Sequence, residues 1–170
     1  MKKLFNILGF QLSWWACVLG VANGLNYLGP IVMLFFLIIH FYLYSISKAE
    51  IKLIIYFAFI GTLIDTLISL TGVLSFEGLY KTNKIIAPLW ITAMWCGFAA
   101  TINHSMAWLQ NRWLMSFILG AILGPLAYFT GEQFGAIIFY RPTFDLSIIL
   151  ATVWGLSIPF IYFVNKKLVN

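Results

Sequence analysis

Six long, predominantly apolar runs constrain the fold of this chain more than any other feature. They cover residues 4–22, 28–46, 51–74, 88–109, 113–139 and 146–164. Because an α-helix rises about 1.5 Å per residue, each run is long enough to cross about 30 Å of hydrocarbon. Barrel strands would alternate apolar and polar residues, whereas segments such as 31–41 are apolar on every side. The sequence therefore predicts an all-α, polytopic membrane protein, with six transmembrane helices in one bundle and a single integral membrane domain over residues 1–170.

The composition excludes a water-soluble globule. Hydrophobic residues make up 62% of the chain and charged residues 9%, against about 45–50% and about 25% in ordinary soluble domains. The net charge of +5 does not indicate a nucleic-acid partner, because the basic residues stand in ones and twos at the ends of the apolar runs. Basic residues in such places meet anionic lipid headgroups, so the expected partners are membrane lipids.

The same basic residues predict the orientation. With the N-terminus in the cytoplasm, seven lie on inner connections and three on outer ones; the inner set is Lys2, Lys3, Lys48, Lys52, Arg112, Lys166 and Lys167, and the outer set is Lys81, Lys84 and Arg141. Cytoplasmic connections carry the excess of Lys and Arg in membrane proteins. We therefore expect both termini in the cytoplasm.

Asp65 is the only charged residue between Lys52 and Glu77, and it lies deep in the third apolar run. A charge at the bilayer centre costs at least about 2.5 kcal/mol, so it needs a partner or a function. Gly61 and Ser69 lie four residues before and after it, on the same helical face. This face should point at protein rather than lipid. The alternative to a functional role is that Asp65 accepts hydrogen bonds that join helices.

Depth arithmetic places four more candidates in the outer half of the bundle with Asp65. At 1.5 Å per residue, Trp95 and Tyr128 reach about the level of Asp65, Glu132 lies near the outer boundary, and Trp90 matches an interfacial anchor. Glu132 could equally be a water-exposed residue of the interface. A carboxylate among aromatic rings could bind a polar or cationic headgroup. The predicted binding residues of an outward-facing polar pocket are therefore these five.

The two histidines form a separate candidate. His40 and His104 are predicted at similar depths near the cytoplasmic ends of two runs, where two imidazoles could ligate one haem from opposite faces. Histidines in membrane proteins more often hydrogen-bond locally. No nucleophile elbow, phosphate loop, dinucleotide fingerprint or zinc-spaced set of Cys and His appears. The sequence therefore predicts no cofactor and no metal site, and leaves open whether the protein is an enzyme.

Several short segments in a fixed order resemble one family. They are 15–20 (WACVLG), Asp65 with Gly72, 88–90 (PLW) with Trp95 and 98–99 (FA), and 124–128 (GPLAY) with Gly131. This order resembles a family of small multi-span bacterial inner-membrane proteins of unknown function, over nearly the whole chain. The resemblance implies a location in the bacterial inner membrane. It also implies lipid handling, because such proteins are often encoded near enzymes that modify fatty acyl chains, including cyclopropane-synthase-like methyltransferases.

Three functions follow as hypotheses. The first is an inner-membrane protein that binds or moves a lipid or small amphiphile in the polar pocket around Asp65. The second is a membrane-embedded enzyme or accessory subunit that acts on lipid acyl chains. The third is a structural or partner-binding subunit, whose protein partners the sequence does not identify.

Overall fold

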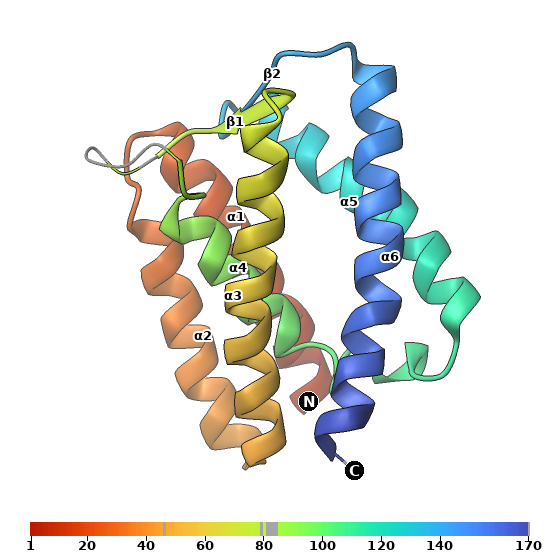
Figure 1. Ribbon diagram of the computed structural model, residues 1–170. Helices are drawn as coiled ribbons and strands as arrows, with labels where there is room; N and C mark the ends of the chain where they lie inside the picture. The colour runs from red at the N-terminus through yellow and green to blue at the C-terminus, as the bar shows by residue number, and fades with distance from the viewer. Residues whose placement is uncertain (46, 79, 81–84, 170) are drawn as a thin grey trace.

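A computed structural model describes residues 1–45, 47–78, 80 and 85–169 of the chain (Figure 1). Within these residues the fold consists of helices and one short two-stranded sheet. The elements are α1 (Lys2–Ala22), α2 (Leu28–Tyr44), α3 (Lys48–Leu70), β1 (Leu74–Phe76), α4 (Leu89–Ala99), a 3-10 turn (Ala107–Leu109), α5 (Trp113–Gln133), β2 (Ile137–Phe139) and α6 (Thr143–Val169). The predicted all-helical membrane architecture is confirmed at this level.

Four of the helices are long and apolar enough to cross a membrane, namely α1, α3, α5 and α6. Their 21 to 27 residues correspond to about 31–40 Å at 1.5 Å per residue. The helix α2 has 17 residues and α4 has 11. The described residues therefore hold six α-helices, of which four have the length of a span. Both termini lie at the same end of the molecule, opposite the small sheet (Figure 1).

The fourth predicted span, 88–109, is wrong as one continuous helix. The helix ends at Ala99, and residues 100–106 form turns before the 3-10 segment. Backbone outside a helix can sit inside a membrane domain only where protein groups satisfy it. Here the Asn6 side chain donates from Nδ2 to the Ala100 carbonyl at 3.2 Å and accepts from the Ser105 backbone N–H at 3.2 Å. The buried amide of α1 thus replaces hydrogen bonds that the interrupted helix gives up.

Two other helices, α3 and α5, end several residues before the predicted spans 51–74 and 113–139 do. The residues 71–74 and 134–139 do not continue α3 and α5, because the chain turns at Gly72 and Gly135, which adopt positive φ values of 72° and 78°. Strands β1 and β2 then pair antiparallel, with Ser75 opposite Ile138. The predicted outer residues Lys81 and Lys84 lie outside the described residues.

Close packing of α5 on α6 depends on the Gly120 and Gly124 spacing. A Cβ at Gly120 would overlap the Trp154 carbonyl oxygen, and one at Gly124 would overlap the Trp154 side chain. The two glycines therefore let α6 approach α5 closely, as small residues four apart do in membrane helix pairs. Trp154 lies directly over this seam.

Candidate functional site

Three of the five predicted binding residues form one buried hydrogen-bonded cluster. Asp65 on α3 is 2% exposed. Its Oδ1 accepts a hydrogen bond from the Tyr128 hydroxyl on α5, and its Oδ2 accepts one from Trp95 Nε1 on α4 at 2.7 Å. Both carboxylate oxygens therefore have donors, and one side chain joins three helices. Such an arrangement matches the interhelical role that was the alternative to ligand binding.

Trp95 connects this cluster to α6. Its ring stacks on Trp154 with centroids 4.8 Å apart and an interplanar angle of 4°. The position of the ring requires Gly61 on α3, because a Cβ there would overlap the Trp95 indole. The carboxylate of Asp65 thus fixes Trp95, and Trp95 in turn supports Trp154.

The other two predicted residues lie outside the cluster. Trp90 is buried, but its Nε1 donates to the Glu77 backbone carbonyl at 2.9 Å. Its ring packs on Phe76, which in turn packs on Tyr128. Glu132 is half-buried at the end of α5, where it accepts a 3.4 Å hydrogen bond from Gln133. None of the three cavities described in the structure is lined by any of the five residues.

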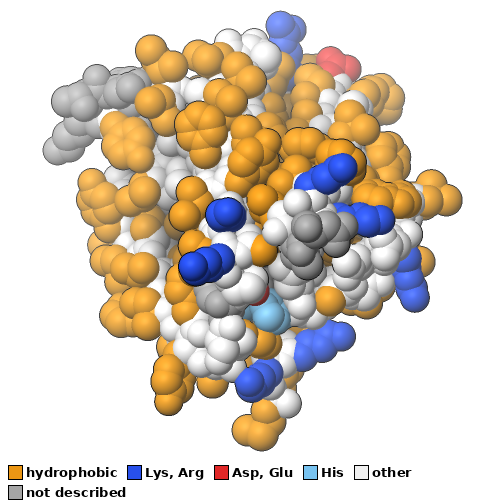
Figure 2. Space-filling view, turned by 60° about the horizontal axis from the view of Figure 1, so that its bottom comes forward, with side chains coloured by type: hydrophobic (Ala, Val, Ile, Leu, Met, Phe, Trp, Pro, Cys, Tyr) orange, Lys and Arg blue, Asp and Glu red, His pale blue; other side chains and the backbone are white. Residues whose placement is uncertain are grey.

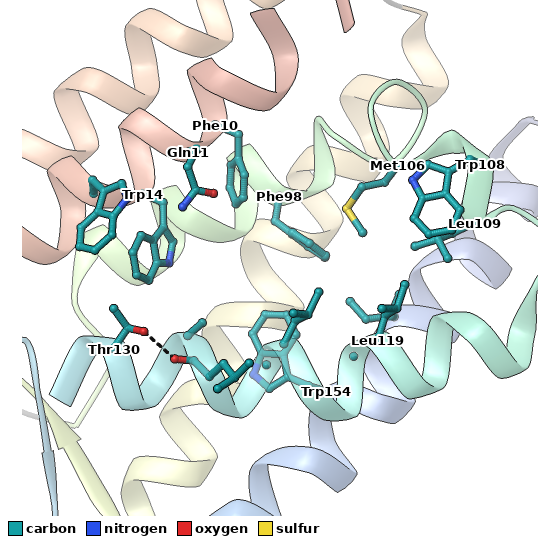
Figure 3. Close-up of a pocket in the computed structure, with 17 residues that line it drawn as sticks. Phe10, Gln11, Trp14, Phe98, Met106, Trp108, Leu109, Leu119, Thr130 and Trp154 are labelled. Atoms are coloured by element: carbon teal, nitrogen blue, oxygen red, sulfur yellow. Dashed lines mark hydrogen bonds between the residues drawn. The ribbon is translucent and has the colours of Figure 1, made fainter. Parts of the chain in front are cut away.

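The largest of these cavities lies between α1 and α5, and we name it the lateral cavity. Its volume is about 570 Å³. Figure 3 shows Phe10, Gln11 and Trp14 of α1 facing Trp154 and the residues of α5 across it. Its lining is almost entirely apolar and comes from α1, α4, the segment after α4, α5 and α6: Phe10, Gln11, Trp14, Trp15, Phe98, Met106, Trp108, Leu109, Leu119, Gly120, Leu123, Gly124, Leu126, Ala127, Thr130, Trp154 and Ile158.

A second buried polar cluster lies near the end of the molecule that holds the termini. The Glu50 Oε1 atom, in the first turn of α3, is 3.0 Å from His40 Nε2 on α2 and 2.7 Å from His104 Nε2 in the segment after α4. Asn6 Nδ2 lies 3.4 Å from the other ring nitrogen of His40. The ring of Tyr44 packs on both imidazoles, with centroids 4.7 Å from His40 and 4.0 Å from His104. We name His40, Glu50 and His104 the inner cluster.

The geometry of the inner cluster contradicts the haem alternative. The two imidazole centroids are 4.7 Å apart, and both Nε2 atoms converge on the same oxygen of Glu50. A haem iron would need the two Nε2 atoms on opposite faces of a porphyrin. Here both atoms contact one Glu50 oxygen, so no porphyrin fits between the two rings. Glu50 also opens onto a polar cavity of about 450 Å³, lined by Ser47, Asn103, Gln110, Asn111, Asn165 and Lys166.

Sequence reasoning placed His40 and His104 at a similar depth, and the structure brings them together, but it missed Glu50 and the role of Trp154. Glu50 has an ordinary place at a helix start, three residues after Ser47, which predicts a capping box. Ser47 Oγ does accept from the Glu50 N–H at 3.2 Å. The Glu50 carboxylate, however, binds the two histidines, and no local pattern indicates this. Trp154 lies in an apolar run between Val153 and Gly155, and nothing in the run singles it out.

The chain matches the family described as "Protein of unknown function (DUF2878)" over residues 3–160, and it belongs to that family. No curated protein and no solved structure matches it.

Proposed function

We propose that this protein binds the acyl chain of a lipid or small amphiphile in the lateral cavity. In this proposal it is a multi-pass protein of the bacterial inner membrane with both termini in the cytoplasm. The observation that carries the proposal is the cavity itself, whose volume of about 570 Å³ lies in the range of about 300–1,000 Å³ that is typical of small-molecule sites.

The chemistry of the lining favours a hydrocarbon chain. Aromatic rings from α1, α4 and α6 face each other across the cavity, and Gln11 and Thr130 are its polar side chains. The Thr130 hydroxyl already donates to the Leu126 carbonyl at 2.8 Å (Figure 3), so the Gln11 amide is the main polar group that the lining side chains offer to a ligand. A headgroup would therefore have to remain at the edge while the chain enters.

Access from the bilayer supports the same ligand class. Leu123 and Leu126 line the cavity and are 56% and 51% exposed. Both lie in the middle of α5, a helix long and apolar enough to cross the membrane. At that height the surroundings are hydrocarbon, so the chain of a membrane lipid can enter sideways without crossing water.

Under this proposal the Asp65 cluster positions the wall of the cavity. Trp154 lines the cavity, Trp95 stacks on it from behind, and Asp65 holds Trp95 and Tyr128. The predicted site residues Asp65, Trp95 and Tyr128 thus act through Trp154. The Asp65 carboxylate does not line the lateral cavity, so it does not contact the ligand.

Quenching of tryptophan fluorescence by brominated acyl chains tests the proposal. The purified chain is placed in nanodiscs of phosphatidylcholine that carries bromine at mid-chain. Because the cavity is lined by four Trp residues, we expect a saturable quenching component in addition to the quenching from bulk lipid. Ala127→Phe, which fills the cavity from α5, should remove that component.

The matched control is Ile122→Phe, at a position of α5 that is 53% exposed and does not line the cavity. It should leave the quenching curve unchanged. If Ala127→Phe and Ile122→Phe give the wild-type curve, or if the wild type shows bulk quenching alone, the proposal is wrong. If the chain purifies together with a second protein and shows no saturable quenching component, the hypothesis of a structural or partner-binding subunit is favoured instead.

A further inference from the structure

We propose that His40, Glu50 and His104 bind one divalent first-row transition-metal ion. Two imidazoles and one carboxylate form a donor set typical of Zn²⁺ and of other ions of that series. The three side chains come from α2, the first turn of α3 and the segment after α4. Their exposed side-chain fractions are 0% for His40, 7% for Glu50 and 15% for His104. A buried group of this composition inside a membrane domain is unusual, since each member is costly to place there.

The distances are close to those of a metal site. Ligand bonds of about 2.0–2.1 Å in tetrahedral geometry place neighbouring donor atoms about 3.3 Å apart. The Glu50 oxygen is 3.0 Å from one imidazole nitrogen and 2.7 Å from the other, and all three donor atoms lie within 4.8 Å of one another. The two distances from Glu50 must therefore lengthen slightly and the two imidazole nitrogens must come closer together, and His104 lies in the turns that follow α4.

The polar cavity beside Glu50 supplies a place for a further ligand. Three protein ligands with one open position are the arrangement of catalytic rather than structural zinc sites. Lys166 lines this cavity. Figure 2 shows a His side chain on the same end of the molecule, beside an acidic side chain and among several Lys and Arg side chains. This positive surround favours an anionic oxygen, such as that of a phosphate or carboxylate group, as the ligand at the open position.

Metal binding would also change the contact between His40 and Asn6. If Asn6 Nδ2 donates to Nδ1 across their 3.4 Å separation, the Nε2 atom of the same ring is the donor to Glu50. A metal on Nε2 requires that proton to move to Nδ1, where a ligating histidine needs an acceptor. The Asn6 amide must then turn its oxygen to the ring and give up its bonds to Ala100 and Ser105. Loading the site is therefore coupled to the turn that follows α4.

Zinc titration of the full-length purified protein tests the site. The protein in detergent is stripped with a chelator and titrated with Zn²⁺ against a chromophoric competitor, and Co²⁺ is used separately for its visible absorption. We expect one ion per chain and a tetrahedral Co²⁺ spectrum. Hydrogen exchange at the Ser105 amide should become faster on loading, because the Asn6 acceptor is withdrawn.

Glu50→Gln is the decisive variant, because a glutamine oxygen still accepts from both imidazoles while the anionic ligand is lost. We expect zinc affinity to fall at least about tenfold, with the fold retained. His104→Ala should lose stoichiometric binding, whereas the control Gln110→Ala, at an exposed cavity residue outside the cluster, should keep it. Wild-type binding of less than one ion per chain, or equal affinity in wild type and Glu50→Gln, would show that the cluster is only a hydrogen-bonded brace.

Discussion

The coupling between Asp65 and Tyr128 offers the sharpest test of the described packing. In a double-mutant cycle, Tyr128→Phe removes only the hydroxyl that donates to Asp65 Oδ1, and Asp65→Ala removes the acceptor. Polar side-chain contacts between membrane helices contribute about 0.6 kcal/mol on average and at most about 1.7 kcal/mol. Since the acceptor here is a buried carboxylate with donors on both oxygens, we expect a coupling free energy in the upper part of that range.

The single variant Asp65→Ala should cost more than Tyr128→Phe. It leaves two buried donors, the Tyr128 hydroxyl and Trp95 Nε1, without their acceptor, so the expected loss is about 1–3 kcal/mol. In the Asp65→Ala background, Tyr128→Phe should cost almost nothing, because its partner is already absent. The free energy of unfolding is measured by SDS titration in mixed micelles, followed by circular dichroism.

Tyr162 provides the control for this cycle. It is another buried tyrosine, whose hydroxyl donates to the Met106 carbonyl at 2.7 Å. The effects of Tyr162→Phe and Asp65→Ala should add within about 0.5 kcal/mol, as they do for independent sites. A Tyr128–Asp65 coupling as small as this control value would refute the account of Asp65 as the acceptor that joins α3 to α5.

Three further predictions concern packing and topology. Gly61→Ala should lower the free energy of unfolding by about 1–3 kcal/mol, because the added Cβ overlaps the Trp95 ring; the same SDS titration measures it. Asn165→Leu should cost about 1–2 kcal/mol, because Asn103 and Asn165 exchange two amide hydrogen bonds of 3.1 and 2.6 Å, and a neutral result would mean that this pair does not hold α6. In a cysteine-free background, Arg141→Cys should react with an impermeant thiol reagent added outside the cell, whereas a cysteine at either terminus should react only after permeabilisation; the reverse pattern would invert the proposed orientation.

The length and apolarity of the runs were enough to predict helices, since backbone inside hydrocarbon must satisfy its own hydrogen bonds. They were not enough to predict where α4 ends. Hydropathy treats residues 100–106 as part of an apolar run, but Thr101, Asn103, His104 and Ser105 bring four polar side chains into five consecutive residues. The interruption depends on Asn6, which lies 94 positions from Ala100 in sequence. The local sequence pattern around residue 100 therefore cannot predict that Asn6 will bind there.

The depth arithmetic succeeded where helices are regular. A constant rise per residue placed Asp65, Trp95 and Tyr128 at one level, and the structure brings these three side chains into contact. It could not give the direction in which each side chain points. The polar pocket expected around Asp65 depends on that direction, and the two carboxylate oxygens face donors on α4 and α5 rather than one of the described cavities.

The distribution of polar contacts also accounts for the presence of the lateral cavity. Lipid tails are as apolar as leucine, so helices in a bilayer do not associate to hide hydrophobic surface. In this chain α5 is held to α6 by the Gly120 and Gly124 seam and to α3 by Asp65. Between α1 and α5 lies the lateral cavity, and beyond the end of α5 the rings of Trp15 and Phe134 meet with their centroids 5.3 Å apart. An unfilled space between these helices loses only dispersion contacts, and an acyl chain restores them. We therefore expect a lipid chain to fill the space, rather than the helices to close over it.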